Sequence, residues 1–74
     1  MATDNITYEI TRHIGVISKE KNDWQRELNL VAWNGNPAKY DIRTWSPDHD
    51  RMTRGITLSS EEAAKVAELL AGII

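Results

Sequence analysis

The sequence predicts an α+β fold in which a four-stranded antiparallel curved sheet is followed by one C-terminal helix. Apolar and polar residues alternate through much of residues 6–58, which is typical of half-buried strands. Apolar residues recur at helical spacing only after residue 59. An Asn34-Gly35 pair between two alternating stretches adds a tight hairpin. We therefore expect a single domain over residues 1–74, with the sheet at about 6–58 and the helix at about 60–72.

The first predicted strand covers residues 6–19 and is read as one long strand or two short ones. We expect it to bend near residues 13–15, because the internal Gly15 is typical of a β-bulge. A polar turn over residues 19–23 leads into a second strand at 24–33. Its apolar face carries Leu28, Leu30 and Ala32.

The third predicted strand covers residues 38–45, with Tyr40 and Ile42 on its inner face. Turn-forming residues at 46–50 lead to a short fourth strand at 53–58, which points Ile56 and Leu58 inward. Ser59 and a glutamate three residues later have the spacing of a helix capping box. The apolar stripe of the helix that follows contains Ala63, Val66, Ala67, Leu70 and Ile74, widened by Leu69 and Ile73.

One helix can cover only one face of this sheet. Alternation places Trp33, Lys39, Arg43 and Trp45 together on the opposite face. Flat aromatic rings beside cations suit single-stranded nucleic acid, because bases stack on the rings while phosphates pair with the cations. The alternative is that one or both tryptophans complete a core or a dimer contact.

Further basic residues stand at the ends of the predicted strands, and the charge of the chain is unevenly distributed. Lys19 and Lys21 end the first strand, and Arg51 and Arg54 enter the fourth. Either pair could line a binding groove or simply be solvated. Residues 12–54 hold eight basic and six acidic side chains, although the whole chain has a net charge of -2. Trp24 could pack under its loop or contact a ligand.

A chain of 74 residues without cysteine has few means of stabilising a small core. We therefore expect a homodimer. An interface is predicted at the apolar end of the helix, formed by Leu69, Leu70, Ile73 and Ile74. The alternative is fraying at the end of the chain.

Enzymatic, metal and membrane functions find little support in the residues. No paired carboxylates, Ser-His-Asp set or glycine-rich phosphate loop stands in a plausible setting, so we expect no catalytic activity and no cofactor. His13 and His49 are far apart in sequence, and the consecutive residues 48–50 are a poor metal site. No apolar run approaches the roughly 20 residues of a membrane span, and no basic-then-apolar leader is present. We expect a cytoplasmic protein.

Residues 40–45 (Tyr-Asp-Ile-Arg-Thr-Trp), then a turn and residues 54–62 (Arg-Gly-Ile-Thr-Leu-Ser-Ser-Glu-Glu), resemble the C-terminal domain of the positive-cofactor-four family of transcriptional coactivators. The strand and hairpin at 27–35 also fit, with Trp33 at an aromatic position of the family. The similarity covers roughly residues 8–72 and is best with the short bacterial YdbC-like branch, which implies access to the bacterial nucleoid.

The resemblance implies a homodimer whose curved sheets bind single-stranded DNA with little sequence preference, with helices meeting across the two-fold axis. It places Trp33, Arg43, Trp45 and Arg54 on binding positions and Lys39 in a basic hairpin. RNA and the transcription machinery are further candidate partners. The alternative function is a protein-interaction module that uses the same basic and aromatic face.

Overall fold

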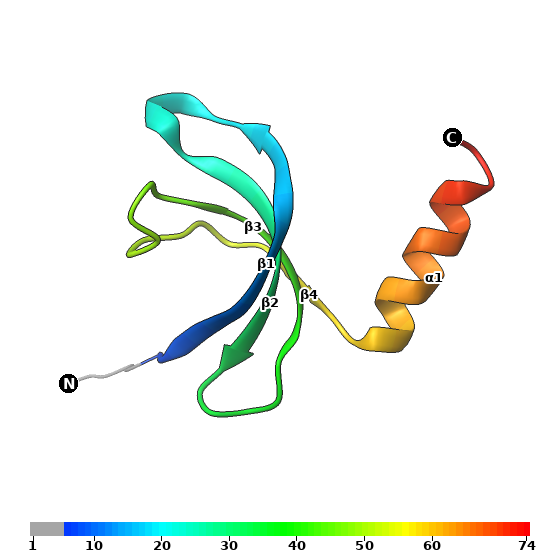
Figure 1. Cartoon of the computed structure of the whole chain (residues 1–74), viewed down its shortest axis with the longest axis horizontal. Helices are drawn as coiled ribbons and strands as arrows, with labels where there is room; N and C mark the ends of the chain where they lie inside the picture. The colour runs from blue at the N-terminus through cyan, green and yellow to red at the C-terminus, as the bar shows by residue number, and fades with distance from the viewer. Residues whose placement is uncertain (1–5) are drawn as a thin grey trace.

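The computed structural model describes residues 6–74 and contains the predicted sheet and helix (Figure 1). All strand pairs are antiparallel, and the strands lie side by side in chain order. This confirms the predicted fold class. A short 3-10 helix, η1, forms part of the first connection. The elements are β1 (Tyr8–Lys19), η1 (Lys21–Asp23), β2 (Gln25–Trp33), β3 (Lys39–Trp45), β4 (Ile56–Leu58) and α1 (Ser60–Ala71).

The sheet is strongly curved because β1 is irregular along its length. Its pairing with β2 shifts between Ile10 and Arg12, between His13 and Gly15, and between Val16 and Ser18. Each irregularity of this kind bends a strand and increases its twist. The bend expected near residues 13–15 is therefore present, within one continuous strand. Figure 1 shows the β1–β2 hairpin and the β3–β4 connection extending to the side of the sheet away from α1.

The β2–β3 hairpin turns at Asn34 and Gly35, as the sequence predicts. Their φ angles are 51° and 77°, and the Asn36 N–H donates to the Trp33 carbonyl over 2.9 Å. Positive φ at both central positions is the geometry of a type I′ turn, which suits the twist of the flanking strands. The resulting register pairs Leu30 with Tyr40 and keeps the predicted apolar residues on one face.

Strand β4 is shorter than the expected 53–58 and contains only Ile56–Leu58. A Cβ atom at Gly55 would collide with the Ile42 carbonyl and the Arg43 side chain, so the chain crosses β3 very closely before pairing begins. Helix α1 starts as predicted. The Ser59 side chain accepts from the Glu62 N–H over 3.1 Å, and the Glu62 carboxylate accepts from the Ser59 N–H over 2.8 Å.

The sequence predicts that the sheet face toward α1 is the buried one, but the most deeply buried residues lie on the face turned away from α1. We call this the concave face. Among residues 6–74, the only fully buried hydrophobic side chains are Val31 and Trp45. They are accompanied there by the buried polar residues Glu27, Asn29 and Asp41. The curved sheet and the loop over residues 46–52 therefore enclose a small, partly polar core.

The apolar face expected to pack under the helix is open instead. A groove of about 550 Å³ separates α1 from the sheet, lined by side chains such as Leu28, Ile42, Leu58, Ala67 and Leu70. No residue of α1 is buried. Figure 1 shows the helix standing apart from the strands. One helix of this length does not close over so curved a sheet, so much of the apolar surface stays exposed.

Candidate nucleic-acid interface

Trp33 of β2 and Arg43 of β3 meet on the concave face, on the two central strands of the sheet. The guanidinium carbon of Arg43 lies 4.7 Å from the centroid of the Trp33 ring, a cation–π arrangement. Arg43 also donates to both carboxylate oxygens of Asp41, over 2.6 and 2.9 Å. The Thr57 hydroxyl donates to Asp41 over 2.9 Å. The half-buried indole is thus held by an arginine whose charge is largely balanced.

Lys39 adds an uncommitted cation beside the same ring. It lines a hollow of about 320 Å³ with Trp33, Pro37 and Thr57. The Lys39 side chain is exposed, and residues 6–74 provide it with no ion pair. The predicted grouping of Trp33, Lys39 and Arg43 on one face is therefore present, with Lys39 the member free to meet a phosphate.

The sequence predicts that Trp45 presents its ring on the uncovered face of the sheet, but the ring does not lie on an open surface. The residue is fully buried. The Tyr8 ring lies 5.3 Å from it and the His49 ring 5.7 Å from it, centroid to centroid. Tyr8 also lies 5.8 Å from Trp33, so it separates the two tryptophans, which do not form a direct pair. The loop over residues 46–52 folds back over this part of the sheet and covers the indole.

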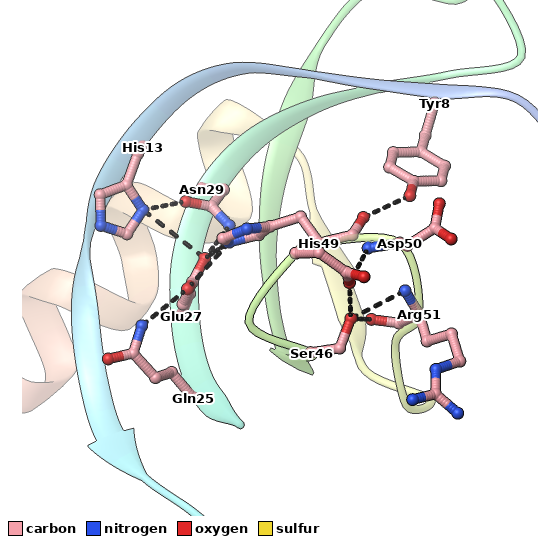
Figure 2. Close-up of polar contacts among 10 residues, drawn as sticks. Tyr8, His13, Gln25, Glu27, Asn29, Ser46, His49, Asp50 and Arg51 are labelled. Carbon is pink, nitrogen blue, oxygen red and sulfur yellow. Dashed lines mark hydrogen bonds and ion pairs between the residues drawn. The ribbon is translucent and has the colours of Figure 1, made fainter. Parts of the chain in front are cut away.

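Glu27 is the centre of a polar network beneath that loop (Figure 2). His49 Nε2 lies 3.0 Å from both Glu27 oxygens, and Asn29 Nδ2 donates to Oε1 over 3.1 Å. Gln25 Nε2 donates to Oε2 over 3.2 Å. On the other side, His13 Nδ1 lies 2.8 Å from the Asn29 side-chain oxygen and 3.6 Å from Glu27. Glu27 is only 1% exposed, but its carboxylate has hydrogen-bond partners on both oxygens.

This environment lowers the pKa of Glu27. Burial is the largest single influence and acts to raise the pKa, but it is outweighed by several lowering influences together, of which the hydrogen bonds from Asn29 and His49 are the largest. The positive charge that His49 carries when protonated, and the hydrogen bond from Gln25, act in the same lowering direction. Glu27 is therefore an ionised group in the folded protein at neutral pH.

The loop that carries His49 is held by its own side chains. Ser46 donates to Asp48 Oδ1 over 2.7 Å, and the Asp50 N–H donates to the same oxygen over 2.9 Å. These bonds lower the pKa of Asp48. His49 has a φ of 59°, which is uncommon outside glycine. The backbone thereby turns the His49 ring toward Glu27 and its carbonyl toward the Tyr8 hydroxyl, 2.5 Å away.

The remaining predicted cations lie around the edges of the sheet. Lys21 and Arg51 line one hollow together, although they are 30 positions apart in the sequence. Lys19 is exposed at the end of β1, and Arg54 is exposed just before β4. Trp24, whose role the sequence left open, is half-buried with the Arg51 guanidinium carbon 5.6 Å from its ring centroid.

The polar network was missed by sequence reasoning. Glu27 and Asn29 alternate with leucines on β2, a pattern that resembles an ordinary solvated face. Their burial depends on the loop over residues 46–52, and nothing in local spacing indicates that this loop folds back onto them. His49 was considered only as part of a poor metal site. No three histidine, aspartate or glutamate side chains in residues 6–74 are placed to hold a metal ion.

The structure thus defines the chain as an open, curved antiparallel sheet with a single C-terminal helix and an aromatic, cation-bearing concave face. Residues 20–69 match the family model described as Transcriptional Coactivator p15 (PC4). The match spans more than half of the chain, which therefore belongs to this family, as the resemblance in residues 40–62 predicts.

An uncharacterized protein of Treponema pallidum (strain Nichols) is 44% identical to this chain over 70 residues. The alignment covers 95% of this chain and 82% of that protein. Within the part of the chain that the structure describes, no helix has the length and apolar character needed to cross a membrane.

Proposed function

We propose that this protein binds single-stranded nucleic acid, chiefly DNA, with little sequence specificity, and that it acts in transcription or DNA maintenance. The observation that carries the proposal is the Trp33 ring, held by Arg43 on the concave face beside the exposed Lys39. A base can stack on such a ring while a neighbouring phosphate pairs with the lysine. Membership of the coactivator family supports the same assignment.

The proposed footprint follows the basic edges of the sheet away from Trp33. Lys19, Lys21, Arg51 and Arg54 are all exposed, and none forms an ion pair within residues 6–74. Side chains of this kind follow a phosphate backbone without reading its bases. We therefore assign them to backbone contacts, and we assign Trp45 a supporting role beneath the loop.

The acting form in this proposal is a homodimer built on the open apolar groove. Leu69, Leu70, Ile73 and Ile74 of the predicted interface are 46% to 94% exposed in one chain. Leu70 also lines the groove, opposite Ile14 and Ile17 of β1. An apolar surface of this extent on a small domain is typical of an interface between subunits. Two copies would each close the groove of the other.

The proposed function is tested by fluorescence anisotropy with a labelled 20-nucleotide single strand of mixed sequence, at several salt concentrations. We expect saturable binding that weakens as salt rises, because released counterions contribute to the affinity. A duplex of the same sequence should compete poorly. The affinity for an RNA strand of the same sequence, compared with that for the DNA strand, shows which of the two the protein prefers. Absence of binding at low salt would reject the proposal and favour the protein-interaction alternative.

A further inference from the structure

A second aromatic and basic hollow lies at the far end of β2 from Trp33. It has a volume of about 640 Å³ and is formed where the β1–β2 hairpin approaches the loop that follows β3. The side chains that matter for its chemistry are Lys21, Trp24, Arg26 and Arg51, and the lining also contains Thr44 and Thr53. Arg26 and Trp33 are an odd number of residues apart on β2, so their side chains point to opposite faces of the sheet. Thr44 pairs with Arg26, and this hollow is therefore on the face opposite Trp33.

The cations of this hollow are uncommitted, unlike Arg43. The structure gives Lys21, Arg26 and Arg51 no ion pair within residues 6–74. Within the described residues, the Arg26 side chain makes one hydrogen bond, a long one of 3.4 Å from Nε to the Thr44 hydroxyl. The single acidic group in the lining, Glu20, already accepts from the Ser18 hydroxyl over 2.9 Å. The hollow therefore has an excess of positive charge.

The backbone of Trp24 is held in a closed turn before any ligand arrives. Its carbonyl accepts from the Glu20 N–H over 2.7 Å, and its own N–H donates to the Lys21 carbonyl over 3.2 Å. Asn22 and Asp23 complete this compact turn with φ angles of 59° and 66°. A half-exposed ring on a fixed backbone loses less conformational freedom on binding than a ring on a flexible segment, which favours its use as a stacking surface.

Arg51 approaches the same ring from a second rigid segment. Its N–H donates to the Ser46 hydroxyl over 3.0 Å, and its carbonyl accepts from the Ser46 N–H over 2.9 Å. The guanidinium carbon then lies 5.6 Å from the Trp24 ring centroid. Two independently closed turns thus place a flat ring and a cation together, which is the combination that single strands use.

We propose that Trp24 is a second base-stacking platform for single-stranded nucleic acid and that Lys21, Arg26 and Arg51 bind the phosphates beside it. This inference rests on the proposed function and extends its footprint. Trp24 and Trp33 lie at opposite ends of the β2 segment and on opposite faces of the sheet, so a strand that contacts both rings passes around the sheet.

The test measures affinity for a labelled 20-nucleotide oligothymidine in three proteins: the unmodified protein, Trp24→Leu and Trp24→Phe. Leucine keeps an apolar side chain but removes the flat ring, so affinity should fall about 5- to 150-fold. Phenylalanine keeps an aromatic face and should retain most of the affinity. Circular dichroism and sedimentation confirm the fold and the assembly of each variant.

The phosphate contacts are tested by the salt dependence of binding in Arg26→Gln and Arg51→Gln. Each substitution should reduce the slope of log K against log salt by about 0.7, the value of one phosphate contact on a single strand. Lys65→Gln is the matched control, because Lys65 is an exposed lysine on α1 paired with Glu68. Its slope should equal that of the unmodified protein.

The outcomes separate this inference from the proposed function. If the unmodified protein binds but folded Trp24→Leu binds equally well, the second platform is rejected while the Trp33 site stands. Unchanged slopes in both arginine variants would reject the phosphate contacts, even if Trp24→Leu failed to fold. If the unmodified protein does not bind the oligonucleotide at all, the proposed function itself fails.

Discussion

The Arg43 guanidinium is held by both oxygens of the buried Asp41 carboxylate, over 2.6 and 2.9 Å, two positions earlier on the same face of β3. Arg43 therefore has a structural role in addition to any contact that it makes with a ligand. It is fixed against the Trp33 ring, and its charge is balanced before a phosphate arrives.

Asp41→Asn should destabilise the protein by about 3–5 kcal/mol, because it leaves the Arg43 charge without its partner in a poorly hydrated site. Arg43 is only 13% exposed at its side chain. Urea denaturation at one fixed protein concentration measures the loss. Thr57→Val is the matched control, since it removes one hydrogen bond to the same carboxylate and should cost less. Equal midpoints for Asp41→Asn and the unmodified protein would contradict the role given to the pair.

Trp45→Ala should lower stability by about 3–5 kcal/mol, because it empties a fully buried site between Tyr8 and His49. The midpoint and slope of urea denaturation together measure this loss. A variant that unfolds at the normal midpoint yet loses affinity for single strands would instead return Trp45 to the role of a ligand contact.

Trp33→Leu should weaken single-strand binding by about 1–3 kcal/mol, the value of one base stacked on an aromatic ring. The half-buried ring lies at the edge of the core, so we expect a folded variant whose circular dichroism matches that of the unmodified protein. Lys65→Gln on α1 serves as the control for binding. Undiminished affinity in the folded Trp33→Leu protein would remove the main support for a nucleic-acid site on the concave face.

Glu27→Gln should change how stability depends on pH. The pKa of Glu27 is lowered in the folded protein from an ordinary value of 4.5. The folded state therefore favours the carboxylate, which contributes stability above about pH 4.5 and loses that contribution as pH falls through the folded-state pKa. The stability difference between the two proteins, measured by urea denaturation from pH 7 to pH 3, should shrink with acidification. A constant difference across that range would show that the ionisation of Glu27 is not linked to folding.

Leu70→Asp should dissociate the proposed homodimer, because it places a charge in the apolar groove that a second copy would fill. Sedimentation velocity should show monomer mass where the unmodified protein shows a dimer. Glu61→Gln, on the exposed first turn of the same helix, should leave the mass unchanged. A dimer of normal stability in Leu70→Asp would place the interface elsewhere, and a monomeric unmodified protein would reject the homodimer.

The order of elements could be predicted from the sequence because it depends on local physical chemistry. Period-two patterning indicated the strands, the Asn34-Gly35 pair indicated a turn with positive φ, and Ser59 with Glu62 indicated the start of the helix. Alternation also placed Trp33 and Arg43 on one face of neighbouring strands, where their side chains do meet.

Which face of the sheet is buried was decided only by the tertiary structure. Burial of Glu27 and Trp45 depends on sheet curvature and on a loop that returns over the concave face, and both result from contacts between distant residues. The same long-range folding brings Arg51 to Trp24, 27 positions away. Local spacing determines which way a side chain points from its strand, whereas the solvent, ring or carboxylate that it meets depends on where the rest of the chain folds.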